Sequence, residues 1–501
     1  MANGLKGLAK DTVIYGMTNI VSKFLNWLLA PFYIRVLADT AEYGIVTNLY
    51  AWVSVVLVVL TLGLETGLFR FMSTEEEPDR VYGTCLRILS GAVATFMLIG
   101  LLLVEDIATA IGHPDNSGYV AMFIAIVSLD AVMSLPFAYL RCQKRPLRFA
   151  FYKFLFVGLN IFFNLLFLVL LPYLDARGVA LPSWLYLPGY GVGYIFVSNL
   201  LASGIEALVM LPVLRPALRA RFDKALVRRI ATYCIPLVLL GLAGNFNKMA
   251  GQILIPGLFD NPEEGMSMVG LFGGNLKISV VMVMFLQAFR FAYDPFVFAK
   301  MKAQDAPTAY RVAMNGFVFF AVLIFLFVMF WMDIFKHIVR PDYYEGLIIV
   351  PYMMISEIIF GIYYNLSIWY KLSDRTYFGA IFSVIGLVLT VSIIIWGVPR
   401  YGIIACAWAA VACNTTMLLL SYLLGRIYHP IRYDTVQILF FLLLAVPIYR
   451  IGMSLSPDSL PIRLLLRSLW LIATMGLVGT GLLAPGLWRK ILAKAHTPTR
   501  H

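Results

Sequence analysis

The chain has 501 residues, of which 61% are hydrophobic and only 13% are charged, and it carries a formal net charge of +12. Soluble domains have roughly 45–50% apolar and about 25% charged residues, so this composition excludes an ordinary soluble protein. The basic excess does not indicate nucleic-acid binding, because Lys and Arg gather in the loops between apolar blocks. We therefore expect a membrane protein without a nucleic-acid partner.

Apolar blocks of about 20 residues recur along the whole chain, and this length spans a hydrocarbon core as a helix. The short basic start and the length of the first block argue against a cleavable signal peptide. The five cysteines show no CxxC spacing, so neither a metal site nor a disulfide is expected. The sequence predicts an all-α integral membrane protein with about fourteen transmembrane helices. Their centres lie near Lys23, Leu57, Ala94, Asp130, Asn160, Ala202, Ala243, Met282, Leu323, Ile358, Leu387, Val411, Leu443 and Met475.

The loops between the predicted helices alternate in charge. Basic loops, such as residues 141–148 and 215–229, follow even-numbered helices, while the loops between them are neutral or acidic. Because Lys and Arg accumulate on the cytoplasmic side, both termini are predicted to be cytoplasmic in a bacterial inner membrane. The loops on the other side are too short for a large catalytic segment, and no Gly-x-x-x-x-Gly-Lys sequence occurs. We expect no enzymatic activity.

The longest basic loop divides the chain into two related halves. We predict an N-lobe at 1–214 (helices one to six), a cytoplasmic amphipathic linker helix at 215–229, and a C-lobe at 230–425 (helices seven to twelve). Helices thirteen and fourteen follow at 426–488, and a basic cytoplasmic tail at 489–501. The halves share the motifs Phe69-Arg70-Phe71 and Phe289-Arg290-Phe291, in comparable places. Transporters often bind their substrate between such repeats.

Several predicted helices carry polar residues at helical spacing, although a charge at the bilayer centre costs about 2.5–3.5 kcal/mol on insertion scales. Such residues face a cavity or a partner, so one interpretation is a cationic cavity in which lysines meet phosphate and amides meet sugar hydroxyls. The alternative is structural: each Lys pairs with an acid, and each Asn bonds a neighbouring helix. The candidate substrate-binding residues are Asn19, Lys23 and Asn26; Lys153, Asn160 and Asn164; Asn245, Lys248 and Gln252; and Lys277.

The predicted helices also contain acids. Asp130, Glu206 and Glu357 are candidate ion-coupling residues for H⁺ or Na⁺, because buried carboxyls can carry protons. Ion pairs with the lysines are the alternative. Glu65 and Arg70, near the cytoplasmic end of helix two, are predicted to form a gate or a structural pair. Arg290 occupies the matching gate position in the second half. No other cofactor is expected.

Residues 8–16, 31–37 and 42–44, together with 287–292 and 294–296, resemble segments of Wzx-type polysaccharide (O-antigen) flippases, members of the multidrug/oligosaccharidyl-lipid/polysaccharide exporter superfamily. The resemblance implies two six-helix lobes in a V around a central cavity, plus two C-terminal helices. It implies alternating-access transfer of an undecaprenyl-pyrophosphate-linked oligosaccharide from the cytoplasmic to the periplasmic leaflet. Lys23 and Lys248 would meet the pyrophosphate. The chain reads Gly251-Gln252 where relatives often have an Asp-Arg pair, so Lys248 or Lys277 would have to substitute.

Three alternatives to this function stay open. They are a flippase for the peptidoglycan lipid precursor, a drug/cation antiporter of the same superfamily, and a non-transport scaffold of a glycan-assembly complex. An antiporter for cations would favour an acidic aromatic pocket rather than four lysines, and a scaffold would not need polar stripes on several helices. The expected partners are the lipid-linked oligosaccharide, membrane lipids, and glycan polymerase or assembly proteins.

Overall fold

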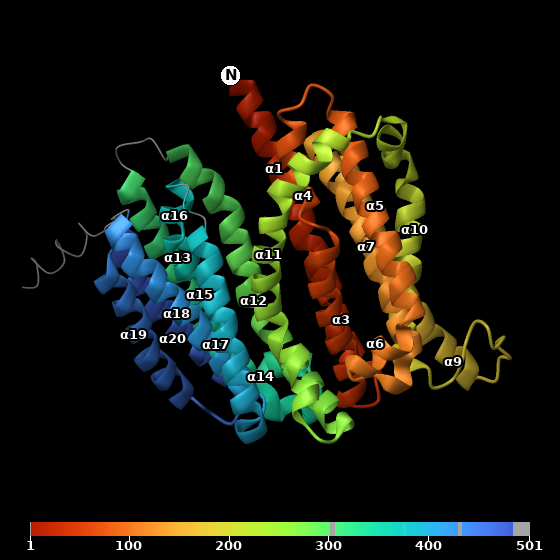
Figure 1. The fold of residues 1–501 in the computed structure, drawn as a ribbon. Helices are drawn as coiled ribbons and strands as arrows, with labels where there is room; N and C mark the ends of the chain where they lie inside the picture. Colours follow the sequence, from red (N-terminus) through yellow and green to blue (C-terminus); the bar gives the residue numbers. More distant parts are fainter. Residues whose placement is uncertain (1, 301–305, 374, 376, 429–432, 484–501) are drawn as a thin grey trace, which may run out of the picture. The chain divides into compact units, whose positions relative to one another are not determined.

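The computed structural model describes residues 2–300, 306–373, 375, 377–428 and 433–483, and these form helices joined by short loops (Figure 1). Within these described ranges, thirteen helices are long and apolar enough to cross a membrane. The predicted all-α membrane fold is therefore confirmed. The predicted basic tail at 489–501 lies outside the described residues.

The helices follow the predicted order. The first, α1 (Ala2–Trp27), is present but is not one of the thirteen, because Asn19, Lys23 and Asn26 lower its apolar content. It leads into α2 (Leu29–Val36). The others are α3 (Thr40–Leu60), α4 (Leu64–Met72), α5 (Pro78–Leu102), α6 (Val104–Ala110), α7 (Ser117–Cys142), α8 (Pro146–Leu165), α9 (Leu171–Ala176), α10 (Gly191–Arg219), α11 (Lys224–Leu254), α12 (Pro262–Lys300), α13 (Ala306–Phe330), α14 (Met332–Phe335), α15 (Ile349–Leu366), α16 (Ile368–Leu372), α17 (Tyr377–Tyr401), α18 (Ile404–Tyr428), α19 (Thr435–Ser454) and α20 (Leu460–Leu483).

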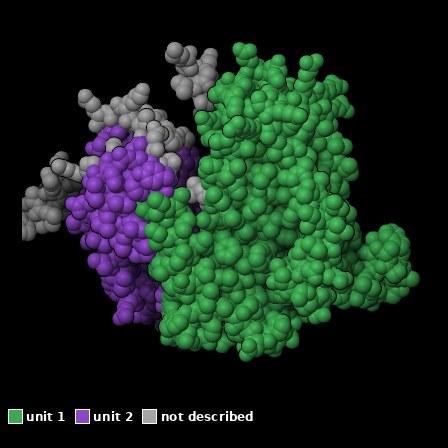
Figure 2. All heavy atoms as spheres, viewed as in Figure 1, with its two compact units in different colours: residues 1–277, 339–349, 380–413 green, residues 278–338, 350–379, 414–501 purple. Residues whose placement is uncertain are grey.

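The chain forms two compact units, shown in Figure 2. Unit 1 consists of residues 1–277, 339–349 and 380–413, and unit 2 consists of residues 278–338, 350–379 and 414–501. Within unit 1, α10 packs on α8, α7 and α5, while α1 packs on α8 and α11 packs on α3. Within unit 2, α13 packs on α19 and α20. Because α11 belongs to unit 1, these units are not the predicted lobes, and the lobe boundaries stay a prediction.

The predicted linker helix at 215–229 is not a separate element. The segment contains the end of α10, a four-residue connection and the start of α11. The Asp223 side chain caps α11 by accepting from the backbone N–H groups of Ala225 and Leu226 at 2.9 and 3.2 Å. The connection is tied down by Arg80, which pairs with Asp223 at 3.1 Å. The apolar periodicity at 218–226 therefore belongs to the ends of two long helices, which explains the error.

Two glycines let α3 and α12 cross very closely in unit 1. A Cβ on Gly44 would overlap the carbonyl of Met266, and a Cβ on Gly270 would overlap the carbonyl of Thr40. At the same crossing, the hydroxyls of Thr40 and Ser267 are hydrogen bonded at 2.6 Å. Small residues permit such close backbone approach between membrane helices. This crossing fixes the start of α12 against the start of α3.

Candidate functional site

The polar stripe of α1 lies next to the polar stripe of α8. Asn160 on α8 donates its amide to the side-chain oxygen of Asn26 at 3.3 Å, and Asn164 donates to Asn160 at 3.0 Å. One residue further along α1, the indole of Trp27 donates to the carbonyl of Lys277 on α12 at 3.0 Å. The structure thus brings together predicted substrate-binding residues from three helices.

In the polar stripe of α11, Asn245 and Gln252 contact α3, whereas Lys248 is exposed. Asn245 donates its amide to the carbonyl of Ser54 on α3 at 2.7 Å, so this amide joins two helices. Further along α11, Asn48 of α3 donates to the carbonyl of Gln252 at 2.7 Å. Lys248, between these two contacts, is exposed. The Asn245 amide therefore has a structural partner, and Lys248 is the member of the stripe that faces away from the core.

Two of the four candidate lysines are exposed on unit 1. Lys23 on α1 and Lys248 on α11 both have exposed side chains, whereas Lys153 and Lys277 are half-buried. A charged side chain in the middle of a membrane-spanning helix faces water or a partner rather than hydrocarbon. Lys23 and Lys248 therefore lie on the exposed sides of α1 and α11.

The third lysine belongs to an internal polar network of unit 1. Asp130 on α7 and Glu206 on α10 interact electrostatically with Lys153 on α8. Asp130 also accepts from the hydroxyl of Ser203 at 3.2 Å, and the Lys153 ammonium lies 3.9 Å from the centre of the Phe137 ring. Two candidate coupling acids thus share one cation. The third acid, Glu357, lies half-buried on α15 in unit 2.

The predicted pairing of Glu65 with Arg70 is wrong. Glu65 on α4 forms an ion pair with Arg141 at the end of α7. A separation of five residues places Glu65 and Arg70 on different faces of the same helix, so they cannot pair. Arg141 also lies over the Phe69 ring, 5.0 Å from its centre. Arg141 stands in a basic loop of the sequence, but nothing in that loop singles it out.

The two arginines of the repeated Phe-Arg-Phe motif make the same kind of contact. The guanidinium of Arg70 lies 4.3 Å from the ring centre of Tyr233 on α11. That of Arg290 lies 4.3 Å from the ring centre of Tyr364 on α15, within unit 2. The Tyr364 hydroxyl donates to Asp294 at 2.7 Å. The motif therefore stacks an arginine on a tyrosine in each half of the chain.

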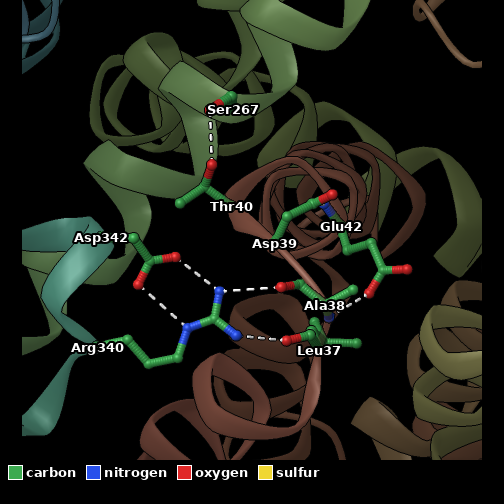
Figure 3. Close-up of polar contacts among 8 residues, drawn as sticks. All are labelled: Leu37, Ala38, Asp39, Thr40, Glu42, Ser267, Arg340 and Asp342. Atoms are coloured by element: carbon green, nitrogen blue, oxygen red, sulfur yellow. Dashed lines mark hydrogen bonds and ion pairs between the residues drawn. The ribbon is translucent and has the colours of Figure 1, made fainter.

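Arg340 forms a latch at one end of unit 1 that the sequence did not indicate (Figure 3). Its guanidinium donates to the carbonyl of Leu37 at 2.7 Å and to the carbonyl of Ala38 at 3.2 Å. Asp342 holds the same guanidinium through two bonds of 3.1 and 2.7 Å. Bidentate pairing fixes the direction of an arginine as well as its position. The latch therefore joins the α2–α3 connection to the segment at 339–349.

The latch and the glycine crossing lie at the same end of unit 1. Thr40, which bonds Ser267 at the crossing, stands two residues after Ala38, whose carbonyl Arg340 holds (Figure 3). The segments that meet there adjoin the loops after predicted helices one, seven and nine. Loops that follow odd-numbered helices share one side of a membrane in the predicted topology. The hydrogen bonds of Arg340 and Thr40 thus join three such segments at this end of unit 1.

A buried histidine lies beside the α3–α11 contacts. His113, 2% exposed, donates from Nε2 to the side-chain oxygen of Asn48 at 2.9 Å. His113 precedes the membrane-spanning segment 114–142, and burial lowers its pKa from an ordinary 6.5 to about 4. The ring is therefore neutral at physiological pH. Among the described residues, no group of three or more His, Cys, Asp or Glu side chains could hold a metal ion.

Among the described residues, thirteen candidate spans and no strand define a multi-pass, all-helical membrane protein. Solved structures share this fold. The lipid II flippase MurJ in an inward closed conformation matches with a TM-score of 0.66 and 12% identity over 95% of this chain and 99% of that one. An inward-facing multidrug resistance MATE family transporter of the MOP superfamily matches with a TM-score of 0.64 and 14% identity, over 81% and 94%.

The Vibrio cholerae MATE transporter VcmN also matches, with a TM-score of 0.59 and 14% identity over 83% of this chain and 95% of that one. No protein-family model matches the sequence. No curated protein sequence matches it either. The similarity at these identities is one of fold, and it places the chain among multi-pass membrane proteins built like transporters and flippases.

Proposed function

We propose that the protein moves an undecaprenyl-pyrophosphate-linked oligosaccharide, an O-antigen, capsule or exopolysaccharide repeat unit, from the cytoplasmic to the periplasmic leaflet of a bacterial inner membrane. The observation that carries this proposal is the exposure of Lys23 and Lys248 on two long helices of one unit. The fold supports it as well, since both a lipid II flippase and drug transporters share it. The resemblance of residues 8–16 and 287–292 to Wzx-type flippases points to the polysaccharide branch.

The charge of such a substrate explains why lysines are needed. A lipid pyrophosphate carries about two negative charges, and burying them unpaired would cost several kcal/mol or more. Lys23 and Lys248 would replace part of the lost hydration with fixed positive charge. Asn26, exposed one turn from Lys23, offers an amide that suits sugar hydroxyls. A transporter for drug cations would gain nothing from these lysines.

We further propose that the Asp130–Lys153–Glu206 network couples transport to H⁺ or Na⁺. Two acids that share a single cation leave one excess negative charge, and a proton or a sodium ion can neutralise it. In an alternating-access cycle, the Arg340 latch would have to open on the side opposite to substrate entry. These two features would give the cycle its coupling site and its closed end.

The test replaces each lysine and measures both export and protein level. In a strain that lacks its own flippase, Lys23→Ala and Lys248→Ala should abolish glycan export without lowering the amount of folded protein. Lys→Arg at either position should retain part of the glycan export, because the positive charge is kept while the shape of the side chain changes. Lys224→Ala, at the exposed first residue of α11, is the matched control and should export normally.

Two results would count against this assignment. Normal export by the Lys23→Ala, Lys248→Ala double variant would rule out the phosphate contact. The single Lys→Ala variants could instead yield less folded protein, and a second substitution that removes a nearby acid could recover the amount. That pair of results would show that the lysines have a structural role.

A flippase for the peptidoglycan lipid precursor is the second candidate, because the MurJ structure matches over almost the whole of both chains. Both substrates present a pyrophosphate on a polyprenyl lipid, so the lysines would serve either. Rescue of a strain depleted of its lipid II flippase would favour this second candidate. Rescue of polysaccharide export without rescue of cell-wall synthesis would favour the first.

A further inference from the structure

A cationic pocket opens in unit 1 where the end of α4 meets the first turns of α11. It has a volume of about 540 Å³, and its lining consists of Arg70, Phe71, Arg228, Arg229, Thr232 and Tyr233. Three guanidinium groups therefore surround one opening. None of these residues belongs to the Lys23 and Lys248 stripes described above, so the pocket is a separate feature of the unit.

Aromatic rings hold two of the arginines in place. Phe71 and Tyr233 pack edge to face with their ring centres 6.1 Å apart, and both line the pocket. Arg70 stacks on Tyr233 at 4.3 Å, and Arg229 lies 5.5 Å from the centre of Phe71. Stacking leaves the N–H edges of a guanidinium available to an anion, because the ring contacts only its face. The pocket is thus organised before any ligand binds.

The nearby acids only partly neutralise the pocket. Glu75 pairs with Arg229 at 2.8 Å, and Glu77 approaches Arg80 at 3.9 Å. Asp79 accepts from the hydroxyl of Tyr139 at 2.9 Å. Within the described part of the chain, neither Arg70 nor Arg228 forms an ion pair with an acid. The three arginines and Glu75 therefore leave two positive charges at the opening.

An apolar track leads away from the pocket along α11. Arg228, Thr232, Ile235 and Leu239 follow one another at offsets of four, three and four, which places them on one face of the helix. Ile235 and Leu239 are 60% and 64% exposed. The face thus begins with a cation and continues as exposed hydrocarbon within a membrane-spanning segment. A lipid that carries a phosphate group has the same order of charge and hydrocarbon.

We propose that this pocket binds the phosphate headgroup of a lipid, with Arg70 and Arg228 on the phosphate oxygens and the tail along Ile235 and Leu239. Its choice of ligand rests on the proposed function, in which the substrate is a polyprenyl pyrophosphate. The same chemistry would also accept an anionic phospholipid. In the predicted topology the pocket lies on the cytoplasmic side, where the substrate lipid would be captured before transfer.

Binding is tested on the purified full-length protein in a neutral detergent by native mass spectrometry. Three probes are used: undecaprenyl pyrophosphate, phosphatidylglycerol and inorganic pyrophosphate. The Arg70→Gln, Arg228→Gln variant should bind undecaprenyl pyrophosphate at least tenfold more weakly. The control is Arg215→Gln, Arg219→Gln, which removes the same charge from exposed arginines at the end of α10 and should change binding less than twofold.

The remaining comparisons separate the ligand sources. Ile235→Ala, Leu239→Ala should weaken binding of the lipid but not of inorganic pyrophosphate. If the protein binds phosphatidylglycerol as tightly as undecaprenyl pyrophosphate, the pocket is a general anionic-lipid site. If inorganic pyrophosphate competes with the lipid and Ile235→Ala, Leu239→Ala does not weaken lipid binding, the lipid assignment is overturned. Equal losses in the two arginine variants would overturn the pocket itself. Arg70→Lys, Arg228→Lys should restore part of the binding, provided that the variants elute and melt as the natural protein does.

The pocket and the proposed function can fail separately. If the natural protein binds the polyprenyl lipid at this pocket but does not transfer it across proteoliposomes, the proposed function is wrong and the pocket stands. If transfer occurs and the arginine variants bind normally, the function stands and the pocket inference is wrong.

Discussion

Glu65 on α4 is paired with Arg141, which reaches it from the end of α7. The two side chains are 43% and 30% exposed, so water screens part of the attraction between them. The pair nevertheless joins two helices of unit 1 beside the Phe69 ring. It is therefore an interhelical tie whose strength can be measured.

A double-mutant cycle on this pair is expected to show a modest coupling. Glu65→Gln and Arg141→Gln should each lower the free energy of unfolding, and the double variant should lose less than the sum. Because the groups are partly exposed, we expect a coupling energy of about 0.5–1 kcal/mol. Thermal unfolding in detergent measures it, and Arg70→Gln with Glu65→Gln is the control that should be additive. Strict additivity for Glu65 and Arg141 would contradict the pair.

Arg340 is expected to control access to its end of unit 1. Arg340→Ala removes two hydrogen bonds to backbone carbonyls, and bonds to charged groups are worth about 1.5–3 kcal/mol each. Thr40→Cys should then react faster with a water-soluble maleimide than in the natural background. Arg400→Ala is the control, because that guanidinium bonds the carbonyl of Trp396 within its own helix at 2.6 Å. Equal labelling rates in the two variants would show that Arg340 does not hold this end closed.

The glycine crossing is expected to tolerate no side chain. Gly270→Ala would force a Cβ against the Thr40 carbonyl, so the two helices must separate and the melting temperature should fall. Gly91→Ala, inside α5, is the matched control because its Cβ would meet open space. Alanine is the better helix former by about 1 kcal/mol, so Gly91→Ala should melt at the same temperature or higher. A fully stable Gly270→Ala protein would refute the close crossing.

His113 is expected to make stability depend on pH. Its pKa is about 4 in the folded protein and 6.5 ordinarily, so the unfolded chain binds more protons between these values. Stability should therefore fall as the pH drops from about 6.5 towards 4, by on the order of 3 kcal/mol. His113→Gln keeps a donor for Asn48 and should flatten this part of the profile in melting curves. An unchanged profile would show that other groups carry the acid sensitivity.

The shared cation of the coupling network is expected to be structural as well as functional. Lys153→Gln leaves the Asp130 and Glu206 carboxylates without their cation, so folded yield and transport should both fall. Adding Asp130→Asn should restore the yield, since one buried charge is then removed. It should not restore the pH dependence of transport if Asp130 carries the ion. Full pH-dependent transport by Asp130→Asn alone would exclude Asp130 as the coupling residue.

The sequence predicted the fold because each element is encoded locally. Apolar blocks of spanning length mark the helices, and stripes such as Asn245 with Lys248 follow from helical periodicity alone. Which partner a polar residue takes was not predictable. Glu65 was predicted to pair with Arg70, but its partner, Arg141, is set by the packing of α4 on α7. The separate linker helix at 215–229 was predicted wrongly because the apolar periodicity there is shared by two consecutive helices.

The Arg340 latch could not be predicted for a different reason. Its acceptors are the carbonyls of Leu37 and Ala38, which every residue type possesses, so no side-chain pattern announces them. The segments that it joins are about 300 residues apart. Asp342, two residues after Arg340, is the side-chain partner that could be recognised from sequence spacing. A short Arg-x-Asp spacing is too common, however, to predict an ion pair.

Arg340 bonds main-chain carbonyls and not side chains at residues 37 and 38, and this affects how these positions can change among homologous sequences. Because Arg340 bonds main-chain oxygens, it needs no particular side chain at 37 or 38 as its partner, and only the burial of Leu37, which is 2% exposed, restricts the choice there. Substitutions there need no compensating change at 340, so the positions should not covary among homologous sequences. Glu65 and Arg141 join two side chains and should change together. The hydrogen bonds from Arg340 to the main chain would therefore leave no covariation between these positions, although the arginine itself would be kept.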